Sequence, residues 1–246
     1  MPAGSIIYSN LLKRGEGVKK VIKQAFVATL PVMAGYIVLG FGFGIILRAS
    51  GFGILLAVAM STFIYAGSMQ YVAIDLLTGG ASLITTALTT LMVNARHLFY
   101  GVSMLEKYKG VGKRKGYLIF GLTDETYSLV CSDTIGLEGK ELKDYYLLVT
   151  LLDHSYWIFG SALGAIAGSL ISFNTTGIDF ALTALFITVF VEQWLSTKKH
   201  FSALIGVGAS VLCLLIFGKD SFLIPTMLVI ALLLCLYKEK EGKQND

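Results

Sequence analysis

The chain has 246 residues, of which 55% are hydrophobic and only 15% are charged, and its formal net charge is +4. Soluble domains carry about 25% charged residues, so this composition excludes an ordinary soluble domain and indicates a polytopic membrane protein. The net charge does not indicate a nucleic-acid partner, because the basic residues cluster in short segments between apolar runs, where they signal membrane orientation.

We expect a polar, basic N-terminal segment (residues 1–24), a single transmembrane transport domain (25–237) and a charged cytoplasmic tail (238–246). A bilayer-crossing helix needs about 20 apolar residues. Such runs lie at 25–47, 52–77, 81–105, 145–171, 179–195, 202–217 and 221–237. The sequence therefore predicts an all-α integral membrane protein with about seven transmembrane helices. The shorter run 117–131 is polar enough to be re-entrant, half-buried or interfacial.

The basic clusters orient the second half of the chain but leave the first half ambiguous. The clusters at 107–115, 198–199 and 238–243 all fall on the cytoplasmic side if four crossings follow residue 145. Three crossings before residue 106 would place the basic N-terminus outside. The alternative is six transmembrane helices plus a re-entrant hairpin at 52–77, with the N-terminus inside.

One pattern in the sequence occurs twice. Tyr-x3-Gly-x3-Gly begins at Tyr36 and again at Tyr156. Two repeats, 25–105 and 145–217, would then have opposite orientation, which is the inverted repeat common in secondary transporters. Ordinary packing of small residues between helices is the alternative explanation.

The stretch 65–70 (YAGSMQ) favours a broken helix inside an apolar run. The small residues Gly67 and Ser68 precede the primary amide of Gln70. Backbone groups freed at a break could bind the charged ends of a zwitterion, so we predict that these three residues contact the substrate. The alternative is an unbroken helix with Gly67 at a close helix contact.

The run 81–105 predicts a continuous helix with one apolar face and one broad polar face. Arg96 is its only formally charged residue, and an arginine near the bilayer centre costs about 2.5–3.5 kcal/mol. We predict that Asn94, Arg96, His97 and Tyr100 line a substrate path, with Arg96 holding a carboxylate. The alternative is a face that joins neighbouring helices, with Arg96 reaching an interface. His97 is equally open between a proton shuttle and a structural residue.

Asp124 and Glu125 are the candidates for proton coupling, because burial or a neighbouring like charge would favour their protonated forms. The alternative is that Thr123 and the two acids form a solvated helix cap. No nucleophile–base motif, phosphate-binding loop or zinc spacing is present. The sequence therefore predicts no enzyme, no cofactor and no metal site.

Three stretches together resemble the AzlC family, the large subunits of branched-chain amino-acid exporters. They are 65–70 (YAGSMQ), 94–103 (NARHLFYGVS) and 120–125 (FGLTDE), and the resemblance covers nearly the whole chain. It implies export of hydrophobic amino acids such as leucine, isoleucine or valine. It also implies secondary active transport through the inner membrane and a small AzlD-type membrane subunit as partner. The cationic N-terminal segment departs from the family's pattern.

We therefore predict a multi-pass inner-membrane transporter that exports a small hydrophobic amino acid in exchange for protons. Its expected partners are the lipid bilayer, the small subunit and the amino-acid substrate, with no nucleic acid. The alternatives are a non-transporting assembly or sensor subunit, and a passive channel.

Overall fold

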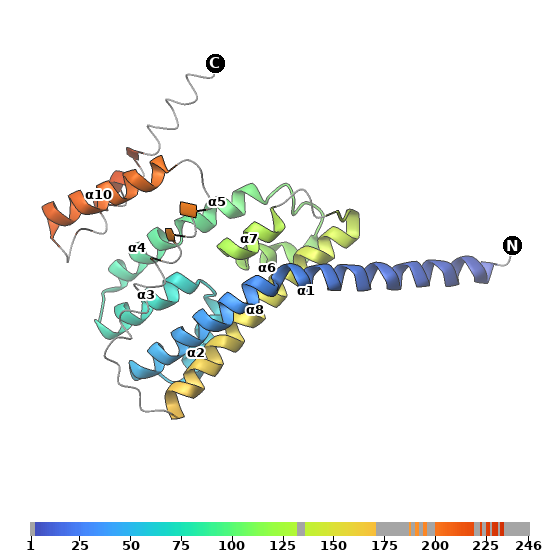
Figure 1. Ribbon diagram of the computed structural model, residues 1–246, viewed down its shortest axis with the longest axis horizontal. Helices are drawn as coiled ribbons and strands as arrows, with labels where there is room; N and C mark the ends of the chain where they lie inside the picture. Colours follow the sequence, from blue (N-terminus) through green and yellow to red (C-terminus); the bar gives the residue numbers. More distant parts are fainter. Residues whose placement is uncertain are drawn as a thin grey trace, which may run out of the picture. The chain divides into compact units, whose positions relative to one another are not determined.

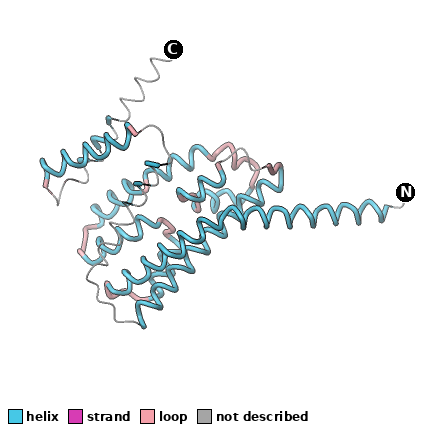
Figure 2. The backbone as a smooth tube through the Cα atoms, viewed as in Figure 1, coloured by secondary structure: helices cyan, strands magenta, loops and turns pink. Residues whose placement is uncertain are grey.

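The computed structural model describes residues 3–131, 136–170, 200–218 and isolated positions between 187 and 233, with side chains described from Gly17 onward. Residues Met1–Ile178 form one compact unit and Asp179–Asp246 a second. The described residues are helical and contain no strand (Figures 1 and 2), in agreement with the predicted all-α class. The predicted spans at 179–195 and 221–237 lie largely outside them. The helices are α1 (Ala3–Ala49), α2 (Ile54–Phe63), α3 (Gly67–Thr78), α4 (Leu83–Val93), α5 (Ala95–Ser103), η1 (Gly112–Arg114), α6 (Lys115–Phe120), α7 (Asp124–Val130), α8 (Gly139–Leu170) and α10 (Phe201–Phe217).

The long helices α1 and α8 lie side by side (Figure 1). Gly40 faces Gly160 and Gly44 faces Gly164, so contacts advance together along both helices and the two helices are parallel. The two copies of the Tyr-x3-Gly-x3-Gly pattern therefore lie on parallel helices, whereas the predicted repeat gives them opposite orientation. Within the described structure, the pattern serves small-residue packing, which lets two backbones approach closely.

Replacing Gly44 with alanine is expected to destabilise the protein, because the added Cβ would collide with the backbone of Ser161 and Ala165. Overpacking of this kind costs about 1–3 kcal/mol. Thermal unfolding in detergent, followed by circular dichroism, measures the change. Gly35→Ala is the matched control on the same helix, since a Cβ there meets nothing within 4 Å. Equal melting temperatures for the two variants would contradict the packing role.

The predicted break before Gly67 is confirmed, and the unbroken-helix alternative is wrong. Helix α2 ends at Phe63 and α3 begins at Gly67. Tyr65, in the turn between them, has a φ of 46°, a left-handed conformation that is uncommon for a bulky residue.

Helices α2 and α3 fold back on each other as a hairpin. Ser61 on α2 has its carbonyl oxygen 3.1 Å from His154 Nε2. One turn further along α8, Trp157 Nε1 donates to Gln70 Oε1 at 2.8 Å. Gln70 Nε2 also donates to Ser61 Oγ at 3.2 Å. Nine residues of continuous helix would separate these two positions by about 13.5 Å, so the chain folds back within the run 52–77.

Helices α6 and α7 form a second hairpin, within the run 117–131. Tyr117 on α6 lies 3.0 Å from His154 Nδ1, and Thr126 on α7 donates to Asp153 Oδ2 at 2.8 Å. Arg114, just before α6, pairs with Asp144 near the start of α8. Since α2 follows the other end of α1, the two hairpins enter from opposite ends of the α1–α8 pair.

The run 81–105 is helical as predicted, but it is not continuous. Helix α4 ends and α5 begins at Asn94, whose φ and ψ are −95° and 4°. Asparagine competes with the helical backbone for hydrogen bonds, which favours such an interruption. The predicted apolar face is exposed, as at Ile84 (75%) and Phe99 (74%).

Large apolar side chains cover much of the outer surface, including Leu55 (83% exposed) and Leu170 (79%). Extensive exposed apolar surface marks contact with a membrane or another protein. Among the described residues, Gly17–Ala49 is the one helical segment long and apolar enough to cross a membrane, judged by length and composition. Ile54–Phe63, Leu83–Val93 and Phe201–Phe217 are shorter apolar helices.

Candidate functional site

The turns of the two hairpins meet against the middle of α1 and α8. The Tyr65 ring lies 4.2 Å from the His154 ring and 6.2 Å from that of Phe120. Tyr36 on α1 lies beside both turns, with its ring 6.5 Å from Tyr65 and its hydroxyl 2.6 Å from Thr123 Oγ1. We call the polar residues gathered here the central site: Tyr36 on α1, Ser68 on α3, Arg96 and Tyr100 on α5, Asp124, Glu125 and Thr126 on α7, and Asp153 on α8.

Arg96 connects the two hairpins through its guanidinium group. Its Nη1 forms an ion pair with Asp124 Oδ2 at 2.6 Å, and its Nη2 donates to Ser68 Oγ at 3.2 Å. Tyr100 OH donates to Asp124 Oδ1 at 2.6 Å. The predicted carboxylate partner of Arg96 is therefore Asp124. The two side chains are 33% and 28% exposed.

Glu125 takes part in a buried polar cluster. Tyr36 OH donates to its Oε2 at 2.7 Å. Thr123 is the N-cap of α7, because its Oγ1 accepts the backbone N–H of Thr126 at 3.2 Å. The helix cap that was predicted as the alternative is therefore confirmed. The two acids also have specific partners in the protein: Asp124 binds Arg96 and Tyr100, and Glu125 binds Tyr36.

Gln70 is fully buried, and both ends of its amide are occupied by Ser61 and Trp157. Gly67 lies directly against the Trp157 indole, which a Cβ would approach to 2.9 Å. Contact between Gln70 and the substrate stays a prediction, and it requires the bond from Trp157 to open first.

The other predicted lining residues lie at the start of α5. Asn94 accepts the backbone N–H of His97 through its carbonyl oxygen at 3.0 Å. The His97 ring packs edge-on against Tyr100 at 5.9 Å. The structure thus brings Ser68, Arg96, Tyr100 and Asp124 into direct contact, with Asn94 and His97 adjacent in the chain.

Sequence reasoning missed Asp153 as a site residue. Its side chain is fully buried in the middle of α8. Among the described residues, Thr126 is the one donor to its carboxyl group, and Oδ1 has no hydrogen bond. An acidic residue inside an apolar run is a functional candidate by default, so the signal was present in the 145–171 span. Tyr36 and Thr126 carry no such signal, because tyrosine and threonine are common in apolar helices.

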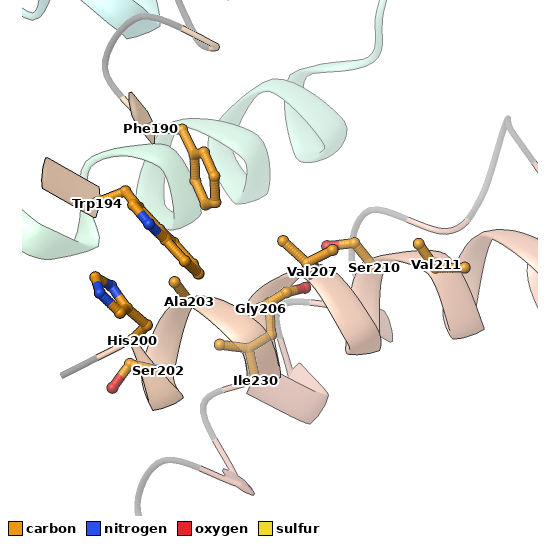
Figure 3. Close-up of a pocket in the computed structure, with 10 residues that line it drawn as sticks. All are labelled: Phe190, Trp194, His200, Ser202, Ala203, Gly206, Val207, Ser210, Val211 and Ile230. Carbon is orange, nitrogen blue, oxygen red and sulfur yellow. Dashed lines mark hydrogen bonds between the residues drawn. The ribbon is translucent and has the colours of Figure 1, made fainter. Parts of the chain in front are cut away.

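A separate hollow lies in the second unit (Figure 3). Its volume is about 620 Å³. The Trp194 and His200 rings stack at 4.0 Å on one side, and the small residues of α10, such as Gly206, form its floor. Its lining is mostly apolar and carries no charged side chain among the residues that define it.

Comparison with known proteins supports an assignment to a family. Residues 31–171 match the AzlC protein family. The chain is 45% identical over 225 residues to the branched-chain amino acid transport protein AzlC of Bacillus subtilis, covering 91% of this chain and 87% of that protein. It is 41% identical to an uncharacterized membrane protein of Helicobacter pylori (90% and 96% covered) and 29% identical to the inner membrane protein YgaZ of Escherichia coli (82% of each). No solved structure gives a significant match. The chain belongs to the AzlC family.

Proposed function

We propose that this protein is a secondary transporter that exports branched-chain amino acids across the cytoplasmic membrane, by exchange for protons and together with a small AzlD-type membrane subunit. The observation that carries the proposal is the ion pair of Arg96 and Asp124 where two opposed hairpins meet. The similarity to the branched-chain amino acid transport protein of Bacillus subtilis supports the substrate class.

The central site has complementary groups for both charges of an amino acid. The Arg96 fork matches a carboxylate bidentately, and its Nε is buried without a hydrogen bond. The first turn of α3 beside Ser68 adds unpaired N–H groups and a positive helix end. Asp124 and Glu125 offer carboxylates to the substrate ammonium group. A proton on either carboxylate would compete with that ammonium, so binding of protons and of substrate exclude each other, which is the condition for exchange.

The hairpins also suggest a topology of six crossings with the N-terminus inside. If α1, the α4–α5 run and α8 cross the membrane while α2–α3 and α6–α7 re-enter, the basic N-terminus and the loop at 107–115 both lie in the cytoplasm. This arrangement satisfies the orientation rule for basic residues, which three crossings before residue 106 do not.

Transport is tested in proteoliposomes that contain this chain and its small subunit. Labelled leucine should move only when both subunits are present, and an imposed proton gradient should accelerate it. A panel of amino acids then defines specificity. A leucine flux that does not change with the proton gradient would contradict exchange and favour a passive channel. Absence of flux for every amino acid tested would favour an assembly or sensor subunit.

A further inference from the structure

A continuous chain of hydrogen bonds joins two carboxyl groups across the central site. Glu125 Oε2 accepts from Tyr36 OH at 2.7 Å, and Tyr36 OH lies 2.6 Å from Thr123 Oγ1. Thr123 Oγ1 donates to Thr126 Oγ1 at 3.1 Å, and Thr126 Oγ1 donates to Asp153 Oδ2 at 2.8 Å. The chain runs from a partly exposed carboxyl group to one that is fully buried.

Counting hydrogens shows that this chain is one proton short when both acids are ionised. It contains four hydrogen bonds, but its three hydroxyl groups supply only three hydrogens. If Tyr36 donates to Glu125 and Thr123 donates to Thr126, no hydrogen remains for the short Tyr36–Thr123 contact. One added proton on either carboxyl group supplies the fourth hydrogen and satisfies every bond.

The surroundings of Asp153 favour the same conclusion. Its carboxyl group is fully buried, and Oδ1 has no hydrogen bond. A buried charge without a partner is costly, and the guanidinium of Arg96 is bound to Asp124. The other titratable groups that face Asp153 or lie next to it are Tyr65 in the α2–α3 turn, Glu125 on α7, and Tyr145 and His154 on α8.

We infer that Glu125 and Asp153 share one proton and exchange it along this hydroxyl chain. In one state Glu125 donates to Tyr36, Tyr36 to Thr123, Thr123 to Thr126, and Thr126 to ionised Asp153. In the other state Asp153 is protonated, all four donations reverse, and Glu125 is ionised. Each hydroxyl group gives up one proton and receives one, so the only net change is the transfer of a proton between the two carboxyl groups.

The two states differ only in which carboxyl group holds the shared proton: the partly exposed Glu125, or Asp153, which is too deeply buried to meet the substrate. In exchange, a substrate ammonium group at Glu125 takes the place of this proton, so the pair of acids holds either the proton or the charge of the substrate. The shared proton itself does not depend on the proposed function. Only the claim that transport uses this proton rests on it.

Infrared spectroscopy of the purified full chain at neutral pH tests the shared proton without any transport assay. Exposed carboxyl groups are ionised at that pH, so a C=O stretch of a protonated carboxyl group, identified by its shift in D₂O, reports the buried proton. The wild type should show this band. Both Glu125→Gln and Asp153→Asn should lose it, because an amide N–H supplies the missing hydrogen from either end of the chain.

The loss in both variants distinguishes a shared proton from a proton that belongs to one acid. A band that survives in either amide variant, or a wild type without the band, would overturn the inference. Asp144→Asn, outside the chain, should keep the band. If either amide variant fails to fold by circular dichroism, Thr126→Val replaces it: the band should shift in Thr126→Val and not in Thr150→Val. Thr150 is an equally buried threonine whose hydroxyl donates to the Tyr146 carbonyl. Identical bands in these two variants would also overturn the inference.

Discussion

Arg96→Ala is expected to lower leucine transport by about 30-fold or more in proteoliposomes. Arg96 is the cation that binds Asp124 and Ser68 at the junction of the hairpins. Removing one partner of a hydrogen-bonded ion pair costs about 2–5 kcal/mol when the pair is buried. Because Arg96 and Asp124 remain about one-third exposed, the lower end applies, and 1.4 kcal/mol corresponds to a factor of ten.

The matched control for this prediction is Arg114→Ala. Arg114 also pairs with an aspartate, Asp144 at 2.7 Å, but it lies near the start of α8 and away from the central site. We expect near-wild-type flux from this variant, since exposed ion pairs contribute about 0–1 kcal/mol. Equal losses in both variants, or loss of pairing with the small subunit in Arg96→Ala, would assign Arg96 a structural role.

Asp153→Asn is expected to abolish the response of leucine flux to an imposed proton gradient. Asparagine keeps the shape of the side chain and its contact with Thr126, but it cannot bind the exchanged proton. Substrate binding at Arg96 should persist, because Asp153 is fully buried and does not contact that residue. Leucine counterflow, which needs no proton gradient, should therefore continue in the variant while gradient-driven flux falls to the background of protein-free liposomes.

Asp144→Asn provides the control for coupling, because it removes a carboxyl group from the same helix outside the hydroxyl chain. Its flux should respond to the gradient as the wild type does. Gradient-driven accumulation that persists in Asp153→Asn would show that the proton uses another route, with Asp124 as the remaining predicted candidate.

The positions at which the helices break could be predicted only in part from the sequence. The small residues before Gln70 predicted the break at Gly67, because glycine and serine stabilise helices poorly. The break at Asn94 was missed, since one asparagine in an otherwise periodic helix is a weak signal. Local reasoning could not show that Trp157, 87 residues away in the sequence, binds the amide of Gln70.

The sequence by itself determined the membrane class, the family and the residues whose burial would be costly, because hydropathy, charge and motif spacing are local properties of the chain. It left the partner of Arg96 open between the substrate and two adjacent acids. Only the tertiary structure decided that Asp124 is this partner, that α1 and α8 are parallel, and that Asp153 joins Glu125 through three hydroxyl groups. Those relations depend on how two hairpins fold back between distant helices, and a fold-back is set by packing between segments rather than by the composition of any one of them.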